Sequence, residues 1–395
     1  MVAAIRGVGQ CARAWLTAPE TRIAGRMGLF RVIYTVFYLW HLSWVDGATL
    51  GLLPGAVWQP VDLLRVVPLR LPSTLPGILE SSLVAALVML LAGLWVRPVT
   101  LAVLVLGTLL EAFHQSFGKV EHASVFLVFY IPLFMLGSEW GGTWSLDALV
   151  ARRAGRASTR PSDDSWRLAL PMRGVLLMLG LLFFSAALAK SVLGDWLTAP
   201  DLVTNLLLGK NIEAVREGLP PCALSPFVVA TPLMSACFRI GLLLFEGSFV
   251  LVLLGGQVRA AYLAATLIFH ALGALLLIVT FTPILIVYAL FVDWQKAVAR
   301  VTPRMRWLGD FLEAVPSGVL TAAVLALAAL AGWSWNITPI LRTTLQLGGW
   351  LDWRTIWLPV LPLALVWLLS ASLALLNIGG RSATGGEPLK RRGVQ

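Results

Sequence analysis

Long, uninterrupted apolar runs constrain this chain more than any other feature of its sequence. A bilayer core about 30 Å thick is crossed by roughly 20 apolar helical residues, and the chain offers about ten candidates. The runs lack the alternation of a β-barrel, and in lipid a helix satisfies its own backbone hydrogen bonds. We therefore predict an all-α, polytopic transmembrane helix bundle. The expected spans are 27–44, 77–95, 98–117, 122–137, 172–192, 233–255, 260–278, 281–294, 316–335 and 355–376, of which the fourth and eighth are short.

The composition excludes a water-soluble protein. Hydrophobic residues make up 58% of the 395 residues and charged residues only 13%, and the mean hydropathy is +0.84. A soluble domain carries about one quarter charged residues, so a soluble Rossmann enzyme, a TIM barrel and a disordered scaffold are set aside. Cys11, Cys222 and Cys237 have no CxxC spacing, which predicts neither a metal site nor a disulfide framework.

Lysine and arginine residues predict how the chain is oriented, because they are retained in cytoplasmic loops. With the N-terminus inside, 20 of the 30 basic residues lie in cytoplasmic segments and seven in external ones. We therefore expect cytoplasmic N- and C-termini and no cleavable signal peptide. The net charge of +10 comes from these scattered residues rather than from one patch. The expected partner is thus the lipid bilayer, with no nucleic acid.

Composition also divides the chain into segments. We expect a cytoplasmic N-terminal segment at 1–26, a membrane domain at 27–295, two further transmembrane helices at 296–376 and a disordered, basic, Gly-rich cytoplasmic tail at 377–395. The external segments 45–76 and 193–232 carry tryptophans and short apolar stretches. Such segments are expected to lie along the outer membrane interface.

Ionisable residues inside apolar helices are candidate functional positions, because each costs about 2.5 to 3.5 kcal/mol at the centre of the membrane. We expect Arg31 to reach the headgroups from a span end, and Glu80 and Glu111 to be interfacial. Among the ionisable residues of the expected spans we single out Arg31, Glu80, Glu111, His122, Lys190, Arg239, Glu246 and His270.

Arg239 and Glu246 are seven residues apart, which places them on one helix face about 10 Å apart along the axis. They cannot pair directly at that separation. Two hypotheses fit the spacing. Each residue has a partner from another element inside a packed interior, or the two line a shared polar seam.

Lys190, His122 and His270 are candidate proton-handling groups. Lys190 follows the apolar run LLFFSAALA, and a lysine in a low-dielectric site becomes a usable base. His270 lies at mid-depth in its span, while His122 and Lys190 lie toward the outer leaflet. The alternatives are a snorkelling lysine, an interhelical hydrogen bond for His270 and a plain interfacial role for His122.

Four stretches, in the same order, resemble segments of the vitamin K-dependent γ-carboxylases. GLFRVIYTVFYLWHL resembles the family's early F-R motif and places Arg31 there. VEHASVFLVFYIPLFMLGSEWGGTWSLDAL resembles a span that begins with a functionally important histidine, here His122, and runs to a W-S-x-D motif, here Trp144, Ser145 and Asp147.

The other two stretches lie further along. FSAALAKSVLGDWL is similar to the segment with the catalytic lysine and matches Lys190 to it. IFHALGALLLIVTFTP is similar to the family's F-H helix and places His270 and Pro283 in register. Over roughly 27–295 the chain is therefore identified as a member of the HTTM superfamily, named for a horizontally transferred transmembrane domain. Ala189 stands where the family often has a second lysine.

The resemblance implies a lyase of the bacterial inner membrane. In such an enzyme a reduced naphthoquinone of the vitamin K or menaquinol type, O2 and a lysine base generate a strong base. That base removes the γ-proton of a glutamate in a secreted or membrane peptide, and CO2 then adds. The candidate site residues at an outward-facing pocket are catalytic Lys190, His122 and His270 and cofactor-binding Arg31, Arg239, Glu246 and Trp144.

Two other functions fit the sequence. Bacterial members of the superfamily include non-catalytic modules that act as maturation or immunity partners of a secreted peptide. A small-solute transporter, with Arg239 and Glu246 lining its path, is the third hypothesis, although the sequence shows no inverted repeat.

Overall fold

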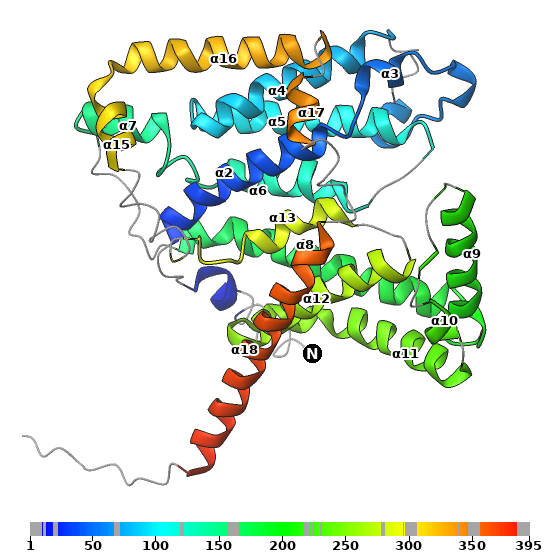
Figure 1. Ribbon diagram of the computed structural model, residues 1–395. Helices are drawn as coiled ribbons and strands as arrows, with labels where there is room; N and C mark the ends of the chain where they lie inside the picture. Colours follow the sequence, from blue (N-terminus) through cyan, green and yellow to red (C-terminus); the bar gives the residue numbers. More distant parts are fainter. Residues whose placement is uncertain are drawn as a thin grey trace, which may run out of the picture. The chain divides into compact units, whose positions relative to one another are not determined.

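Every regular element in the described part of the chain is a helix, as the all-α prediction requires (Figure 1). The structure is a computed structural model. It describes residues 10, 13–18, 23–66, 72–118, 122–156, 166–216, 218, 221–222, 225–229, 231–277, 281–294, 296, 306–337, 340–346 and 356–384.

Six helices in these ranges are long and apolar enough to cross a membrane, which indicates an integral, multi-pass membrane protein. Each coincides with a predicted span. They are α4 (Leu75–Ala92), α5 (Val96–Gln115), α8 (Trp166–Val192), α11 (Pro232–Ser248) with the 3-10 turn η5 (Phe249–Leu254), α16 (Ser317–Ile337) and α18 (Trp357–Thr384).

The other four predicted spans are helical but are not among these six. Two have the length of a span, α2 (Ile23–Leu42) and α12 (Gly256–Leu277). The span expected at 122–137 consists of a π-helical turn, η3 (Phe126–Tyr130), and α6 (Ile131–Leu136). It extends about 16 Å, roughly half the bilayer core. The span expected at 281–294 is shorter still, with η6 (Thr282–Ile284) and α13 (Leu285–Ala289).

Proline explains why the first of these short segments is irregular. Pro132 stands at the start of α6, directly after the π-helical turn. Proline lacks a backbone N–H and clashes with the carbonyl four residues earlier, which favours a local change of helical pitch.

The chain forms two compact units, which we call unit 1 (1–175 and 281–352) and unit 2 (176–280 and 353–395). The predicted pair of helices at 296–376 is divided between them, since α16 belongs to unit 1 and α18 to unit 2. Besides the helices above, unit 1 contains α3 (Gly47–Gly51), η1 (Gly55–Val57), η2 (Asp62–Val66), α7 (Leu146–Arg153), α15 (Arg306–Ala314) and α17 (Ile340–Leu345).

In unit 1, α2, α4 and α5 pack together and α16 packs along α4 (Figure 1). The core of this unit is aromatic. Tyr34 is fully buried, its ring centroid lies 5.5 Å from that of Trp140, and its hydroxyl donates to the Leu127 carbonyl at 2.9 Å. Gly332 allows the approach of α16, because a Cβ there would lie 2.6 Å from the Ser81 carbonyl oxygen on α4.

A buried carboxylate links four elements of unit 1. Glu80 Oε1 accepts hydrogen bonds from Trp335 Nε1 (2.8 Å) and Arg342 Nη2 (2.6 Å), and Oε2 accepts one from the Gly47 N–H (2.9 Å). The side chain is 0% exposed. Glu80, expected to be interfacial, is therefore buried within the protein. A charge at this depth is retained because it is paired and fully hydrogen-bonded.

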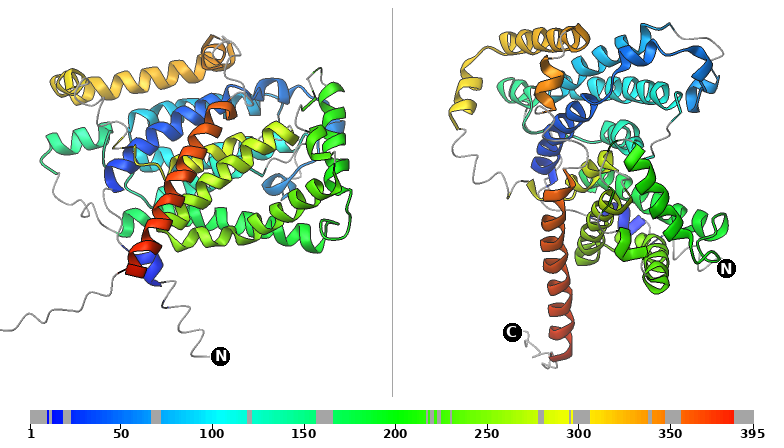
Figure 2. Two further views of the ribbon diagram at one scale, coloured as in Figure 1. Left: turned by 60° about the horizontal axis from the view of Figure 1, so that its bottom comes forward. Right: turned by 45° about the vertical axis from the view of Figure 1, so that its right-hand side comes forward.

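Unit 2 consists of the C-terminal part of α8, then α9 (Leu202–Arg216), α10 (Ser225–Val229), α11 with η5, α12 and α18. The helices α12 and α18 pack against each other (Figure 2). The helix α18 ends at Thr384, so its last turns fall within the segment 377–395 that the sequence predicts to be disordered. Residues 385–395 of that segment lie outside the described residues.

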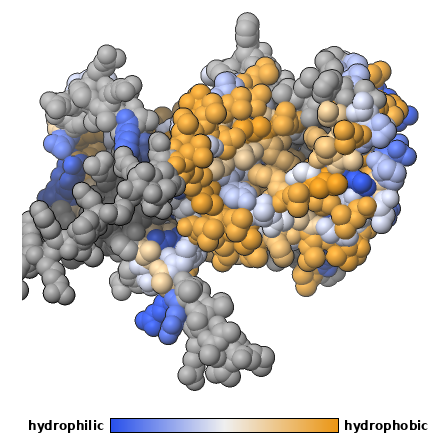
Figure 3. Space-filling model, turned by 90° about the horizontal axis from the view of Figure 1, so that it is seen from below, coloured by the Kyte–Doolittle hydropathy of each residue, from blue (hydrophilic) through white to orange (hydrophobic). Residues whose placement is uncertain are grey.

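Apolar side chains, coloured orange in Figure 3, cover much of the coloured surface in that view. Large exposed residues include Leu244 on α11 and Leu363 and Leu376 on α18, each about two thirds exposed or more. On a soluble protein, large contiguous apolar patches mark interaction sites. Here they lie on helices of membrane-spanning length, as a lipid-facing surface requires.

Candidate functional site

The central feature of unit 2 is an ion pair between two of its long helices. Lys190 near the C-terminal end of α8 donates to Glu246 Oε1 on α11. The Glu246 side chain is only 4% exposed and that of Lys190 27% exposed. The second oxygen, Glu246 Oε2, is buried and has no hydrogen-bond partner among the described residues. One carboxylate oxygen of Glu246 is therefore hydrogen-bonded to the lysine, and the other is an acceptor without a partner among the described residues.

Local sequence determines where both residues lie. Thr231 caps the start of α11 by accepting a hydrogen bond from the Met234 N–H, and Pro232 occupies the first turn, where proline is favoured. The helix α8 ends two residues after Lys190. The following Gly194 turns the chain back, with its N–H bonded to the Ala189 carbonyl.

The turn after α8 brings an aromatic ring over the lysine. Lys190 Nζ lies 5.2 Å from the ring centroid of Trp196, within the range of a cation–π interaction. Trp196 in turn packs against the buried Val203 and Leu207 of α9. Trp196 belongs to the external segment 193–232, which the sequence predicts to lie along the membrane interface, and in the structure it contacts Lys190.

Aromatic rings fill the interior next to this pair. Phe183, on α8, stacks on Phe249 with centroids 4.3 Å apart and also approaches Phe245 at 6.1 Å. Phe245 directly precedes Glu246 in α11, and Phe183 lies seven residues before Lys190, on the same helix face. The stretches of α8 and α11 that carry Lys190 and Glu246 therefore also carry a dense aromatic cluster.

His270 belongs to this aromatic region and not to the ion pair. It is 3% exposed, and its ring lies 5.9 Å from Phe183 and 5.8 Å from Trp357 of α18. Phe183 and Lys190 are about 10 Å apart along α8. Unit 2 thus contains both Lys190 and His270. The histidine contacts the ring of Phe183, which lies two turns before Lys190 on α8.

Arg239 has a separate partner, which decides between the two hypotheses for the Arg239 and Glu246 spacing. Its Nη1 donates to the Ala199 carbonyl at 2.8 Å, whereas Glu246 binds Lys190. Each residue therefore has its own partner from another element, and the two do not share one.

His122 lies in unit 1, as an exposed turn residue before η3. The three predicted catalytic residues are thus not all in one unit. His122 precedes the short helical segment of η3 and α6.

Arg31 and Trp144 do meet, within unit 1. Arg31 is 0% exposed and donates to the backbone carbonyls of Trp140 (3.3 Å) and Trp144. The expectation that Arg31 reaches the headgroups was wrong, because the backbone turn that precedes α7 supplies its acceptors. Trp144 has φ 54°, an unusual conformation for a bulky residue.

The W-S-x-D motif stabilises this junction of helices. Ser145 caps α7 by accepting from the Ala148 N–H. Asp147 accepts from the backbone N–H groups of Trp95 (2.9 Å) and Val96 (2.8 Å) at the start of α5. A carboxylate at a helix N-terminus satisfies groups that have no partner within the helix. In this structure the motif joins α2, α5 and α7.

Sequence reasoning overlooked a polar cluster in unit 1. Glu111, expected to be interfacial, accepts hydrogen bonds from Ser124 Oγ (2.6 Å) and Gln115 Nε2 (2.7 Å). It lies within electrostatic range of His41, which also interacts with His114. The spacing of Glu111, His114 and Gln115 on one helix face was the available signal.

Comparison with protein-family models, with curated proteins and with solved structures found no match.

Proposed function

We propose that this chain is an enzyme of a bacterial inner membrane in which Lys190 and Glu246 move protons during the oxidation of a membrane-dissolved quinol by O2. The observation that carries the proposal is the ion pair between α8 and α11, with a buried carboxylate oxygen left free beside it. The resemblance of FSAALAKSVLGDWL to a catalytic-lysine segment supports the same assignment. The orientation proposed from the basic residues opens this site outward, with both termini in the cytoplasm.

Glu246 provides the means by which Lys190 acts as a base. In the ion pair, Nζ carries three protons and accepts none. Transfer of one proton from Nζ to Glu246 Oε1 leaves a neutral amine and a neutral carboxylic acid, which an apolar site accommodates without two separate charges. The neutral amine then accepts the proton of an acidic hydroxyl group, as a general base does.

The residues around the pair fit a planar hydroxylated ring. Trp196, Phe245 and Phe249 offer aromatic faces and edges next to the pair. Glu246 Oε2 offers an acceptor for a hydroxyl donor. A reduced naphthoquinone, when bound, supplies electrons for the reduction of O2. Glu246 lies among apolar side chains, so a proton held at Oε1 is shielded from solvent, whereas the Lys190 side chain is 27% exposed and can exchange its protons.

The finer proposal concerns the acceptor of this chemistry. By the resemblance, the base formed removes the γ-proton of a peptide glutamate, and CO2 is added at that carbon. His270, in the same unit as Lys190, keeps the role that the resemblance gives it, as a group that binds an oxyanion or assists proton transfer.

The two alternatives predict different behaviour. A maturation or immunity partner of a secreted peptide requires no proton transfer at Lys190 and stays the second candidate. The transporter hypothesis depended on a seam shared by Arg239 and Glu246, and each of these residues binds a different element.

Quinol oxidation in nanodiscs under O2, with reduced menaquinone supplied, tests the proposal. The informative variant is Lys190→Arg. Arginine keeps a positive charge beside Glu246, so the fold is retained, but a guanidinium does not lose its proton in a protein. We expect wild-type turnover and none in Lys190→Arg.

Two controls separate chemistry from folding. Thermal unfolding in the same nanodiscs checks that Lys190→Arg is as stable as the wild type. Lys210, a similarly exposed lysine that is ion-paired with Glu213, provides the control Lys210→Arg, which should leave turnover unchanged. Equal turnover in wild type and Lys190→Arg removes the lysine from the mechanism. An inactive wild type that still captures a secreted peptide favours the partner function.

A further inference from the structure

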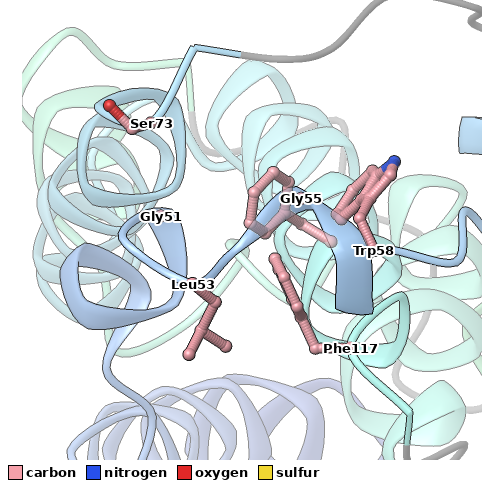
Figure 4. Close-up of a pocket in the computed structure, with 7 residues that line it drawn as sticks. Gly51, Leu53, Gly55, Trp58, Ser73 and Phe117 are labelled. Atoms are coloured by element: carbon pink, nitrogen blue, oxygen red, sulfur yellow. The ribbon is translucent and has the colours of Figure 1, made fainter.

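We propose that a pocket in unit 1 binds a neutral, planar aromatic molecule of about two fused rings, taken up from the bilayer. The pocket has a volume of about 320 Å³. It lies between the segment after α3, the start of α4 and the C-terminal end of α5 (Figure 4). None of the seven candidate site residues lines it.

One wall of the pocket consists of three aromatic rings. Trp58 lies 4.8 Å from Phe113 and 5.1 Å from Phe117, measured between ring centroids, and the two phenylalanines are 5.5 Å apart. Figure 4 shows Trp58 and Phe117 on one side of the cavity, with Leu53 and Ser73 on other parts of its rim. Rings this close contact one another, so they form a continuous aromatic wall.

The lining chemistry selects a neutral ligand. The described residues that line it are Gly51, Leu53, Gly55, Trp58, Ser73, Phe113 and Phe117, and none of these is charged. An ion that entered would lose its hydration without gaining a partner of opposite charge, which costs several kcal/mol. Ser73 and the glycine backbones offer a few polar groups, enough to orient a ligand with one hydroxyl or carbonyl group.

The volume sets the size of the ligand. An apolar cavity of about 150 Å³ is sufficient to hold benzene. A cavity twice that size accommodates two fused rings in contact with the aromatic wall. It also falls at the lower end of the range of roughly 300–1,000 Å³ that small-molecule sites occupy.

The surroundings of the pocket indicate that the ligand arrives through the membrane. The segment that forms its outer edge exposes several large apolar side chains, Leu52 (79%), Leu53 (41%), Val57 (49%) and Val66 (79%). Such residues are stable at the membrane interface and costly in water. A molecule dissolved in the acyl region therefore reaches the pocket without crossing the aqueous phase.

Hydrogen bonds to α5 hold the pocket in this shape. The Gln59 N–H donates to the Ser116 carbonyl at 2.8 Å and the Val61 N–H to Ser116 Oγ at 3.2 Å. Gly51 approaches Ser73 so closely that a Cβ would lie 1.8 Å from the Ser73 carbonyl oxygen. The site is thus formed before any ligand enters, which lowers the entropic cost of binding.

Photolabelling of the full chain in nanodiscs with azidonaphthalene tests this proposal, with labelled peptides identified by mass spectrometry. We expect saturable labelling of residues 53–58 and 113–117. Excess naphthol should compete, and naphthalenesulfonate, which has the same rings and a charge, should not. Trp58→Leu should weaken saturable labelling about tenfold, since it removes one ring of the wall.

Matched variants keep the test decisive if Trp58→Leu folds poorly. Leu53→Trp leaves the aromatic wall intact but fills the cavity, and should also abolish saturable labelling. Trp44→Leu changes a 38% exposed tryptophan outside the pocket and should have no effect. Labelling that rises without saturation, as on lipid-facing α18, overturns the proposal, and so does equal competition by naphthalenesulfonate.

The same experiment distinguishes this site from the proposed catalytic one. The pocket shares no residue with the Lys190 and Glu246 pair. Lys190→Arg should therefore keep saturable labelling at 53–58 whether or not it retains quinol turnover.

Discussion

Lys190 on α8 and Glu246 on α11 are 56 residues apart in the sequence and form an ion pair. The carboxylate is almost completely buried, while the ammonium group remains partly accessible. This asymmetry matters for function, because a proton can enter or leave through the lysine while the glutamate stays in an apolar environment. It also makes the pair vulnerable to the loss of either member.

A double-mutant cycle should reveal that vulnerability. Lys190→Ala leaves Glu246 buried without a counter-charge and should lower the free energy of unfolding by about 1–3 kcal/mol, between the values for exposed and buried pairs. Adding Glu246→Leu to that variant should restore part of the loss, since no charge then remains buried. Denaturant unfolding in mild detergent provides the measurement. Strictly additive effects of the two substitutions would show that the residues do not interact.

Asp147 should stabilise unit 1 through the N-terminus of α5. Asp147→Ala removes the acceptor of two backbone N–H groups and should cost about 1–2 kcal/mol, as the loss of a helix cap does. Asp147→Asn retains one carbonyl acceptor and should lose about half as much. Thermal unfolding of the three proteins side by side checks the order. If alanine and asparagine have equal effects, hydrogen bonding at this helix start is not the cause.

Gly332 and Gly318 provide a matched pair of glycines in α16. A Cβ at Gly332 would lie 2.6 Å from the Ser81 carbonyl oxygen, whereas one at Gly318 has open space. Gly332→Ala should force α16 away from α4 and cost about 1–3 kcal/mol. Gly318→Ala should be neutral or slightly stabilising, because alanine has the higher helix propensity. A similar stability for the two variants would contradict the close packing of α16 on α4.

Asp46, in the segment before α3, should make stability depend on acidity. Burial raises the pKa of this carboxyl group, but hydrogen bonds from the Thr49 N–H and hydroxyl and the charge of Arg342 outweigh burial and hold the pKa below 3.8. The ionised form is therefore favoured by the fold. Its stabilising contribution is complete above the unfolded-state pKa and is lost as the pH falls through the lower folded-state pKa.

Comparison with Asp46→Asn isolates that contribution. Asparagine does not titrate but still caps a helix. The difference in unfolding temperature between wild type and Asp46→Asn should stay constant from about pH 7 to about pH 4 and shrink below that. A difference that stays constant through the acid range would exclude Asp46 as the titrating group.

The sequence did not reveal which residues of other helices and loops bind the candidate site residues. The seven-residue spacing predicts that Arg239 and Glu246 need partners from other elements, which is confirmed, but it does not identify Lys190 and Ala199 as those partners. Glu80 and Arg31 were expected near headgroups because they lie toward span ends. In the structure their partners come from Trp335, Arg342 and the turn before α7, far away in the sequence.

The sequence alone indicates that this protein folds in a lipid bilayer. Continuous apolar runs leave the backbone no partners except those within the same helix, so the all-helical class and the positions of the six long helices follow from composition and length. Tertiary structure decided which polar groups meet. Pairing depends on which helix faces become neighbours, and in an apolar run nearly every face is equally hydrophobic, so no periodic pattern records the choice. For that reason Lys190 and Glu246 were each recognisable as candidates from the sequence, whereas their pairing and the aromatic wall at Trp58 emerged only from the folded chain.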